Sequence, residues 1–120
     1  MNHHDPIHAY KEWLYQLGEI FMVIVITSQN RRHITPHAGK CRKFWKYELK
    51  DGKVMDKQLI EVEKEASFSQ SGEVHEKLLP MDMFVTTGMG DRLREKLKNI
   101  GVHVIVTDEI DPVNFINSLL

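Results

Sequence analysis

The run Met22–Ile26 constrains the fold more than any other part of the sequence. It reads Met-Val-Ile-Val-Ile, without a polar residue. β-Branched residues favour strands, and the lack of polar alternation indicates a strand whose two faces are both buried. Such strands are typical of parallel or mixed sheets with helices on both sides. The run therefore predicts an α/β protein with this strand inside its sheet.

The last third of the chain predicts a strand–helix–strand unit. Met83–Thr86 and Val102–Val106 are apolar runs that predict two buried strands. Between them, Asp91–Asn99 has leucines at helical spacing, and Gly101 is placed to end that helix. A connection of this kind implies a right-handed crossover between parallel strands.

The middle of the chain predicts an antiparallel hairpin. Phe44–Leu49 alternates between two sets of side chains, and Lys53–Val62 follows after Asp51-Gly52. An Asp-Gly pair between two such runs is a strong hairpin signal. The other predicted elements are a polar loop over 27–42, a mobile connection over 67–72, a short helix over 74–79 and a last helix that begins at Asp111-Pro112.

The composition fits one cytoplasmic domain without cross-links. The chain has 120 residues, of which 42% are hydrophobic, and its formal net charge is -1. A domain of this size can bury a core without disulfides or a metal, and its single cysteine, Cys41, cannot form an internal disulfide. The longest apolar stretch, 20–26, is too short for a membrane span, and the N-terminus lacks a signal-peptide pattern. The near-neutral charge leaves no global attraction for membranes or nucleic acid.

Residues 1–21 are predicted to form a helical extension to a domain that spans 22–120. Asp5 and Pro6 suit the start of a helix, and apolar residues up to Phe21 recur at helical spacing. Met22 stands directly before the first predicted strand, so the extension is either native sequence or the product of a misplaced start. A native extension would use its apolar stripe to cover a neighbouring surface or to pair two copies as a homodimer.

Polar residues follow three of the predicted strands. They are Thr27-Ser28, Thr86-Thr87 and Thr107-Asp108. Open α/β sheets bind their ligands at the carboxyl ends of parallel strands. The loop over 27–42 and the turn Gly88-Met89-Gly90 leave the predicted sheet at this same edge. We therefore expect the binding site there.

The loop over 27–42 and the strand after it are basic. Between Ser28 and Tyr47 there is no acid, and the cations are Arg31, Arg32, Lys40, Arg42, Lys43 and Lys46. Two interpretations remain open, a solvated basic loop and an anion site. The turn Gly88-Met89-Gly90 supports an anion site, because glycines let a ligand approach the backbone and a helix N-terminus favours negative charge. Taken alone, these glycines equally fit a tight strand-to-helix turn.

Two soft metal ligands lie in the same loop. His37 and Cys41 are four residues apart. Imidazole and thiolate both bind iron, and the neighbouring Lys40, Arg42 and Lys43 are expected to lower the pKa of the thiol. Two ligands are too few for a closed structural zinc site. The alternative is a surface histidine and an inert buried thiol.

The sequence carries no recognisable catalytic constellation. It has no nucleophile elbow, no His-Glu-x-x-His motif and no paired carboxylates on adjacent apolar strands. The first predicted strand carries no acid, which counts against a nuclease that holds metal ions with strand carboxylates. The chain is therefore expected not to be an enzyme.

Several blocks of the sequence have the order and spacing of a known family. They are Val23–Ser28, Ile34–Phe44, Tyr47-Glu48 and Thr87–Gly90. Together they resemble the dinitrogenase iron–molybdenum cofactor biosynthesis family, which includes NifX, NafY and the C-terminal part of NifB. The resemblance spans residues 22 to about 119.

The resemblance implies a ribonuclease H-like fold, with a five-stranded mixed sheet flanked by helices and without nuclease activity. Members of the family bind iron–sulfur or iron–molybdenum cofactors or their precursors and carry them between assembly proteins, which act as cluster donor and acceptor. The family's histidine before a glycine corresponds to His37, which is followed by Gly39. Ala38 stands where an aromatic residue is common, and Cys41 is not a general family feature.

The residues and the resemblance together predict a non-enzymatic carrier of a metal–sulfur cluster. The expected cofactor-binding residues are Arg31, His37, Gly39, Lys40, Arg42, Thr87, Gly88, Met89 and Gly90, and the expected metal ligands are His37 and Cys41. The alternative is a regulatory or interaction module of the same fold that binds a partner protein, a small anion or, less readily, nucleic acid. In that alternative, Trp45 and Tyr47 would be the residues that stack on bases.

Overall fold

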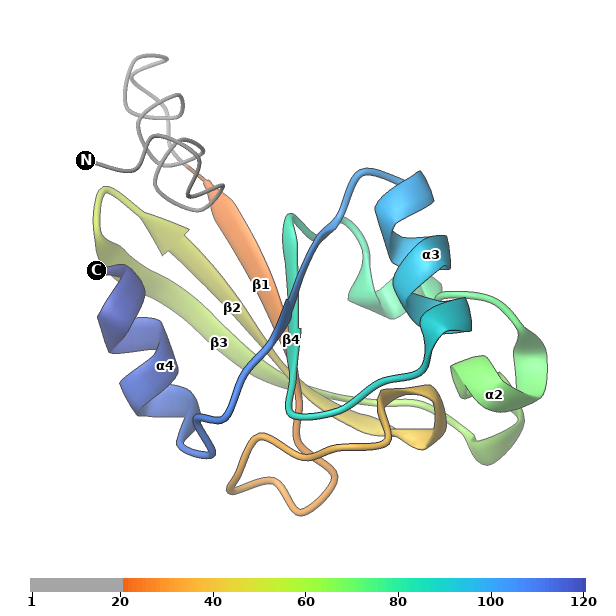
Figure 1. Ribbon diagram of the computed structural model, residues 1–120. Coiled ribbons are helices and arrows are strands. Elements are labelled where there is room, and N and C mark those ends of the chain that lie inside the picture. The colour runs from red at the N-terminus through yellow and green to blue at the C-terminus, as the bar shows by residue number, and fades with distance from the viewer. Residues whose placement is uncertain (1–20) are drawn as a thin grey trace.

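The computed structural model describes residues 21–120, which form a mixed five-stranded sheet in the order β3-β2-β1-β4-β5 (Figure 1). The strands are β1 (Met22–Thr27), β2 (Lys43–Lys50), β3 (Lys53–Glu61), β4 (Met83–Thr86) and β5 (His103–Val106). The strands β1, β4 and β5 are parallel to one another. The β2 strand is antiparallel to both of its neighbours, β1 and β3. The predicted α/β class, mixed sheet and parallel crossover are confirmed.

The β1 strand lies at the centre of the sheet, as its composition predicts. All six of its residues are buried, because β2 and β4 flank its edges and helices cover its two faces. Side chains alternate between the faces, so Ile24 and Ile26 enter one core and Val23 and Val25 the other. An uninterrupted apolar run is therefore required here.

The two faces of the sheet are covered differently. The helix α4 (Pro112–Leu119) covers one face, and α3 (Asp91–Asn99) lies on the other with α2 (Phe68–Ser71) (Figure 1). Three short 3-10 helices complete the connections, namely η1 (Ala38–Lys40), η2 (Lys64–Ala66) and η3 (Glu76–Leu78). Asp111 caps α4 by accepting hydrogen bonds from the backbone N–H groups of Val113 and Asn114.

The hairpin turn has the backbone that its sequence predicts. Asp51 and Gly52 have φ angles of 51° and 74°, the conformation of a two-residue turn that matches the twist of a hairpin. Most of β3 is exposed, because it forms one edge of the sheet. Its register shifts opposite Glu48 and Leu49, and such a bulge makes an edge strand less suited to pairing with another chain.

Three sequence-based expectations need correction or lie beyond the described residues. The segment 67–72 is not an irregular mobile connection, because it holds α2, whose Phe68 packs on the core. The β5 strand is half-buried rather than buried, since it forms the other edge of the sheet. The helix expected over 1–21 falls, apart from the exposed Phe21, outside the described residues. No helix within residues 21–120 is long and apolar enough to cross a membrane.

Candidate functional site

Two buried threonines organise the carboxyl edge of the sheet. Thr27 ends β1, Thr86 ends β4, and their hydroxyl oxygens lie 2.9 Å apart. Thr27 Oγ1 donates to the carbonyl of Thr35 at 2.6 Å. Thr86 Oγ1 lies 3.0 Å from that carbonyl and 3.1 Å from the carbonyl of Gly88, and it accepts from the N–H of Gly88. This threonine pair ties the loop after β1 to the turn after β4.

The loop after β1 is anchored along its length. The N–H of Thr35 donates to Thr27, and the N–H of Ile34 donates to Ile110 at 2.8 Å. The N–H of Ala38 donates to the carbonyl of Gly88 at 3.1 Å, and the side chains of Ile34 and Ala38 are buried. These bonds and the two buried side chains hold the polar loop over 27–42 against the sheet.

Gly88 allows the two loops to meet. A Cβ built at Gly88 would lie 3.1 Å from the Cβ of Pro36, a distance at which one of the two groups must move. The next loop residue, His37, has a φ of 60°, in the left-handed region that non-glycine residues rarely adopt. Its side chain is exposed. Backbone strain of this kind is often found at functional positions, where the surrounding structure holds it.

A groove lies between these two loops. We call it the histidine groove, and it is lined by Pro36, His37, Ala38, Gly39, Lys40, Ser69, Gly88, Met89 and Gly90. Its volume of about 460 Å³ is in the range of small-ligand sites. Six of the residues expected from the sequence meet here, namely His37, Gly39, Lys40, Gly88, Met89 and Gly90. The expected convergence of the loop and the glycine turn is confirmed.

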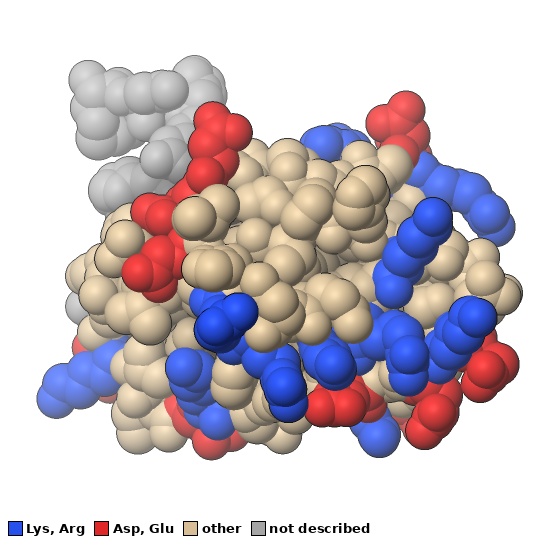
Figure 2. All heavy atoms as spheres, turned by 90° about the horizontal axis from the view of Figure 1, so that it is seen from below, with Lys and Arg blue, Asp and Glu red and all other residues tan. Residues whose placement is uncertain are grey.

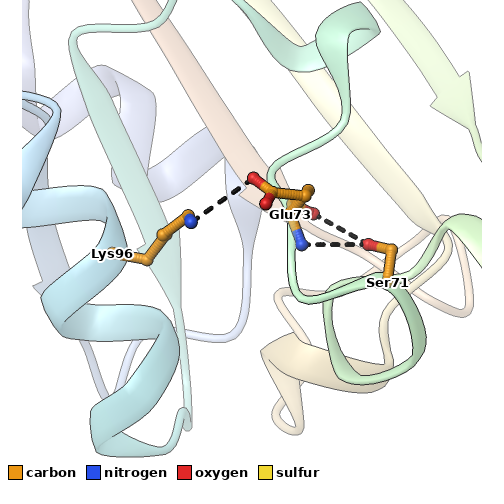
Figure 3. Close-up of polar contacts among 3 residues, drawn as sticks. All are labelled: Ser71, Glu73 and Lys96. Carbon is orange, nitrogen blue, oxygen red and sulfur yellow. Dashed lines mark hydrogen bonds and ion pairs between the residues drawn. The ribbon is translucent and has the colours of Figure 1, made fainter.

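Ser69, which reaches the groove from α2, was missed by sequence reasoning. The segment after α2 is held in place by Ser71, whose hydroxyl accepts from the N–H of Glu73 at 3.0 Å, and by an ion pair of 3.3 Å between Glu73 and Lys96 of α3 (Figure 3). This ion pair is exposed and contributes little to stability, and it links the segment after α2 to α3. The only sequence signal for Ser69 was a small polar stretch, which also fits an ordinary loop.

Cys41 does not reach the histidine groove. Its side chain is 3% exposed, packs in the core beneath α3, and donates from Sγ to the carbonyl of Lys43 at 3.0 Å. Burial raises the pKa of the thiol above its ordinary value of 9.0, so the expected lowering of the pKa by neighbouring cations is wrong. Cys41 is therefore a buried core residue. Within residues 21–120, no three His, Cys, Asp or Glu side chains are grouped to hold a metal ion.

Three other expected site residues also lie away from this groove. Arg31 is exposed, has a φ of 66°, and accepts a hydrogen bond at its carbonyl from Trp45 Nε1. Thr87 donates to the carbonyl of Ile34 at 3.4 Å and acts in the loop contact. Arg42 lines a second groove, described below. All three residues lie in or next to the loops expected from the sequence, but none of them lines the histidine groove.

The positive charge is less concentrated than the sequence suggests. Lys46 is 9% exposed and donates to the carbonyls of Lys77 and Leu79, so it does not join a surface patch. Figure 2 shows the remaining Lys and Arg side chains spread over the face at this end of the sheet, with acids between them. Asp91 in the first turn of α3 already complements the positive end of that helix. An anion here would depend mainly on local cations such as Lys40.

Trp45 and Tyr47 do not form a stacking platform. Tyr47 is 3% exposed, and its hydroxyl has no hydrogen-bond partner among the described residues. Burial raises the pKa of Tyr47, and the negative charge of Asp111 raises it further. Lys57 Nζ lies 4.5 Å from the centre of the Trp45 ring and contacts it as a cation. Because Tyr47 is buried, the expected pair of stacking residues is wrong for Tyr47.

The two glycines at the groove are expected to respond differently to alanine. Gly88→Ala should destabilise the protein by about 1–3 kcal/mol, because the new methyl group meets Pro36 in a packed contact. Gly90→Ala is the matched control, since its Cβ would meet nothing within 4 Å, and it should change stability by less than about 0.5 kcal/mol. Urea denaturation and the amide NMR shifts of His37 and Ala38 measure both effects. Equal effects of the two substitutions would contradict the close approach of the loops.

Comparison with known families identifies the chain. A family model described as "Dinitrogenase iron-molybdenum cofactor" matches residues 21–117, which is most of the sequence. The chain belongs to this family. The match confirms the resemblance of the motif blocks, and it includes both loops of the histidine groove. A search of curated protein sequences found no match.

Solved structures share the fold of this family member. One is the crystal structure of PH0822, with a TM-score of 0.68 and 19% identity over 81% of this chain and 87% of that one. Another is the crystal structure of a protein from Methanocaldococcus jannaschii, described as "a putative dinitrogenase (mj0327)", with a TM-score of 0.63 and 14% identity over 82% and 86% of the two chains. At these identities the likeness establishes the fold alone.

Proposed function

We propose that this protein is a non-enzymatic carrier that binds an iron–sulfur or iron–molybdenum cofactor, or a precursor of one, in the histidine groove. The observation that carries the proposal is the exposed His37, held opposite the glycine turn in a chain of the iron–molybdenum cofactor family. Imidazole binds iron, and glycines allow a cluster to approach the backbone. With Cys41 in the core, His37 is the metal ligand that we retain.

The same residues favour a carrier over a permanent metal site. The cargo would be held by the imidazole of His37, the flexible ammonium group of Lys40 and backbone N–H groups, and such a cargo can be released to an acceptor. A closed site with four protein ligands would instead retain its metal. We place the protein in the cytoplasm, with cofactor-assembly proteins as cluster donor and acceptor. We also propose a homodimer through residues 1–21 and classify the fold as ribonuclease H-like, which the strand order β3-β2-β1-β4-β5 supports.

The test is cluster uptake under anaerobic conditions. Purified apo protein is mixed with isolated iron–molybdenum cofactor or, in a second series, with a protein that donates a [4Fe–4S] cluster. Visible absorption and electron paramagnetic resonance then report binding. His37→Asn is the informative variant, because Asn tolerates a positive φ while removing the imidazole. We expect it to weaken uptake by at least about tenfold.

His33→Asn is the matched control, since His33 is also exposed in this loop but does not line the groove. We expect it to take up the cluster like the wild type. Equal uptake by the wild type and His37→Asn would remove His37 as a ligand. No uptake by the wild type from either source would favour the alternative, an interaction module that binds a partner protein or a small anion.

A further inference from the structure

A second groove lies beside the histidine groove. We call it the basic groove, and it is lined by Lys40, Arg42, Lys64, Ser67, Ser69 and Gln70. Lys40 and Ser69 also line the histidine groove, so these two residues stand between the two. Four of the six side chains come from the segment 64–70, to which sequence reasoning gave no role. Of the six lining residues, the function proposed above uses only the shared Lys40.

Arg42 is fixed at the wall of the basic groove. Its Nε donates to the carbonyl of Val62 at 3.2 Å, and its backbone carbonyl accepts from the N–H of Val62 at 2.8 Å. Its backbone N–H donates to Oε1 of Gln29 at 2.8 Å. The two terminal amino groups of the guanidinium form no hydrogen bond with any residue from 21 to 120. They are therefore preorganised donors whose orientation costs little entropy on binding.

The wall that comes from residues 64–70 is ordered by Ser67. This serine is 4% exposed, and its hydroxyl donates to the carbonyl of Lys64 at 2.9 Å. Its own carbonyl accepts from the N–H groups of Gln70 and Ser71. These bonds close a compact turn that carries three of the lining residues, Lys64, Ser67 and Gln70. The wall is thus built from packed backbone rather than from a loose loop.

The chemistry of the lining favours an anion with several oxygen atoms. Lys40, Arg42 and Lys64 supply three positive charges, and no carboxylate lines the groove. The acids next to Lys64 in the chain, Glu63 and Glu65, are exposed outside it. Lys and Arg side chains are donors only, and the hydroxyl of Ser69 and the amide of Gln70 add further donors. Arg binds phosphate through two parallel hydrogen bonds, and Lys adds a point charge.

We propose that the basic groove binds a small oxyanion of the phosphate class, beside the cluster cargo of the histidine groove, with which it shares Lys40 and Ser69. The oxyanion is held by Arg42, by Lys64 from η2 and by Lys40 from η1. The bound oxyanion is either inorganic phosphate or the diphosphate group of a larger anion. Separate titrations with phosphate and pyrophosphate distinguish the two.

The experiment uses the full-length apo protein, so that its outcome does not depend on cluster binding. Phosphate or pyrophosphate is titrated at constant ionic strength, with chloride as the replaced anion, and nitrogen–proton NMR follows the backbone amides and Arg42 Nε. We expect saturable shifts at Ser69, Gln70 and Arg42, with a weaker effect elsewhere. Arg42→Gln and Lys64→Gln should each weaken the affinity roughly tenfold, which corresponds to a loss of about 1.4 kcal/mol of binding free energy.

Lys64→Gln keeps the test decisive if Arg42→Gln disturbs the contact with Val62, because Lys64 is exposed. Lys98→Gln is the matched control, since Lys98 is exposed on α3 and lines neither groove. It should bind phosphate like the wild type, and so should His37→Asn. Shifts that do not saturate, or that persist unchanged in Lys64→Gln, would overturn the proposal.

Discussion

Native Cys41 is expected to react with iodoacetamide at least about a hundredfold more slowly than the same thiol in denaturing urea. The thiol is 3% exposed, and burial raises its pKa, while the thiolate is the reactive form. Reaction must therefore wait for local or global opening. A hundredfold suppression corresponds to an opening free energy of about 2.7 kcal/mol, well within the range of a folded core.

A second cysteine supplies the control for this labelling experiment. Ser69→Cys places a thiol on an exposed position of the histidine groove, where it should react at close to the rate of an unfolded thiol. Slow labelling at position 41 together with fast labelling at position 69 would fit the structure. Fast labelling of native Cys41 would contradict its burial and would restore it as a candidate cluster ligand.

The raised pKa of Cys41 also determines how the free energy of unfolding changes with pH. Above about pH 9 the thiol of the unfolded chain ionises while the native thiol stays protonated, so the unfolded state binds fewer protons. The stability that Cys41 contributes is therefore complete below pH 9 and is lost as the pH rises through the native pKa. The difference in unfolding free energy between wild type and Cys41→Ala should shrink over this range, and comparing the two variants cancels the parallel effect of Tyr47.

The sequence predicts the sheet well because the decisive signals are local. The run Met22–Ile26 has no polar residue, so only a central strand can bury it, and Asp51-Gly52 fits a turn with two positive φ angles. The rule that ligands bind at the carboxyl edge also located the histidine groove, because it depends only on which strands are parallel.

The side-chain directions at the site could not be predicted, because they depend on contacts between distant segments. Cys41 is buried because β1, β2 and α3 pack around it, although its immediate neighbours are basic. Lys46 points inward because carbonyls of residues 77 and 79 lie within reach of its amine. Ser69 reaches the groove only because Phe68 docks α2 on the core. No periodicity in the sequence carries this information.

Thr86→Val is expected to destabilise the protein by about 1–3 kcal/mol although it conserves the shape of the side chain. The hydroxyl of Thr86 is fully buried and interacts with the carbonyls of Thr35 and Gly88 and with the N–H of Gly88. Valine can make none of these hydrogen bonds, so buried backbone groups in both loops lose a partner. Urea denaturation measures the loss.

The same substitution should also open the histidine groove, because Thr86 joins its two walls. Faster amide exchange at Ala38, whose N–H donates to Gly88, would report this loosening. Thr107→Val is the control, since Thr107 directly follows the neighbouring strand β5, and its hydroxyl accepts from the N–H of Glu109 in its own turn without contacting either loop of the groove. Equal exchange at Ala38 in both variants would show that the threonine pair does not hold the loops together. If only Thr86→Val speeds exchange at Ala38, we expect the same variant to weaken cluster uptake, although Thr86 lies beneath the histidine groove and does not line it.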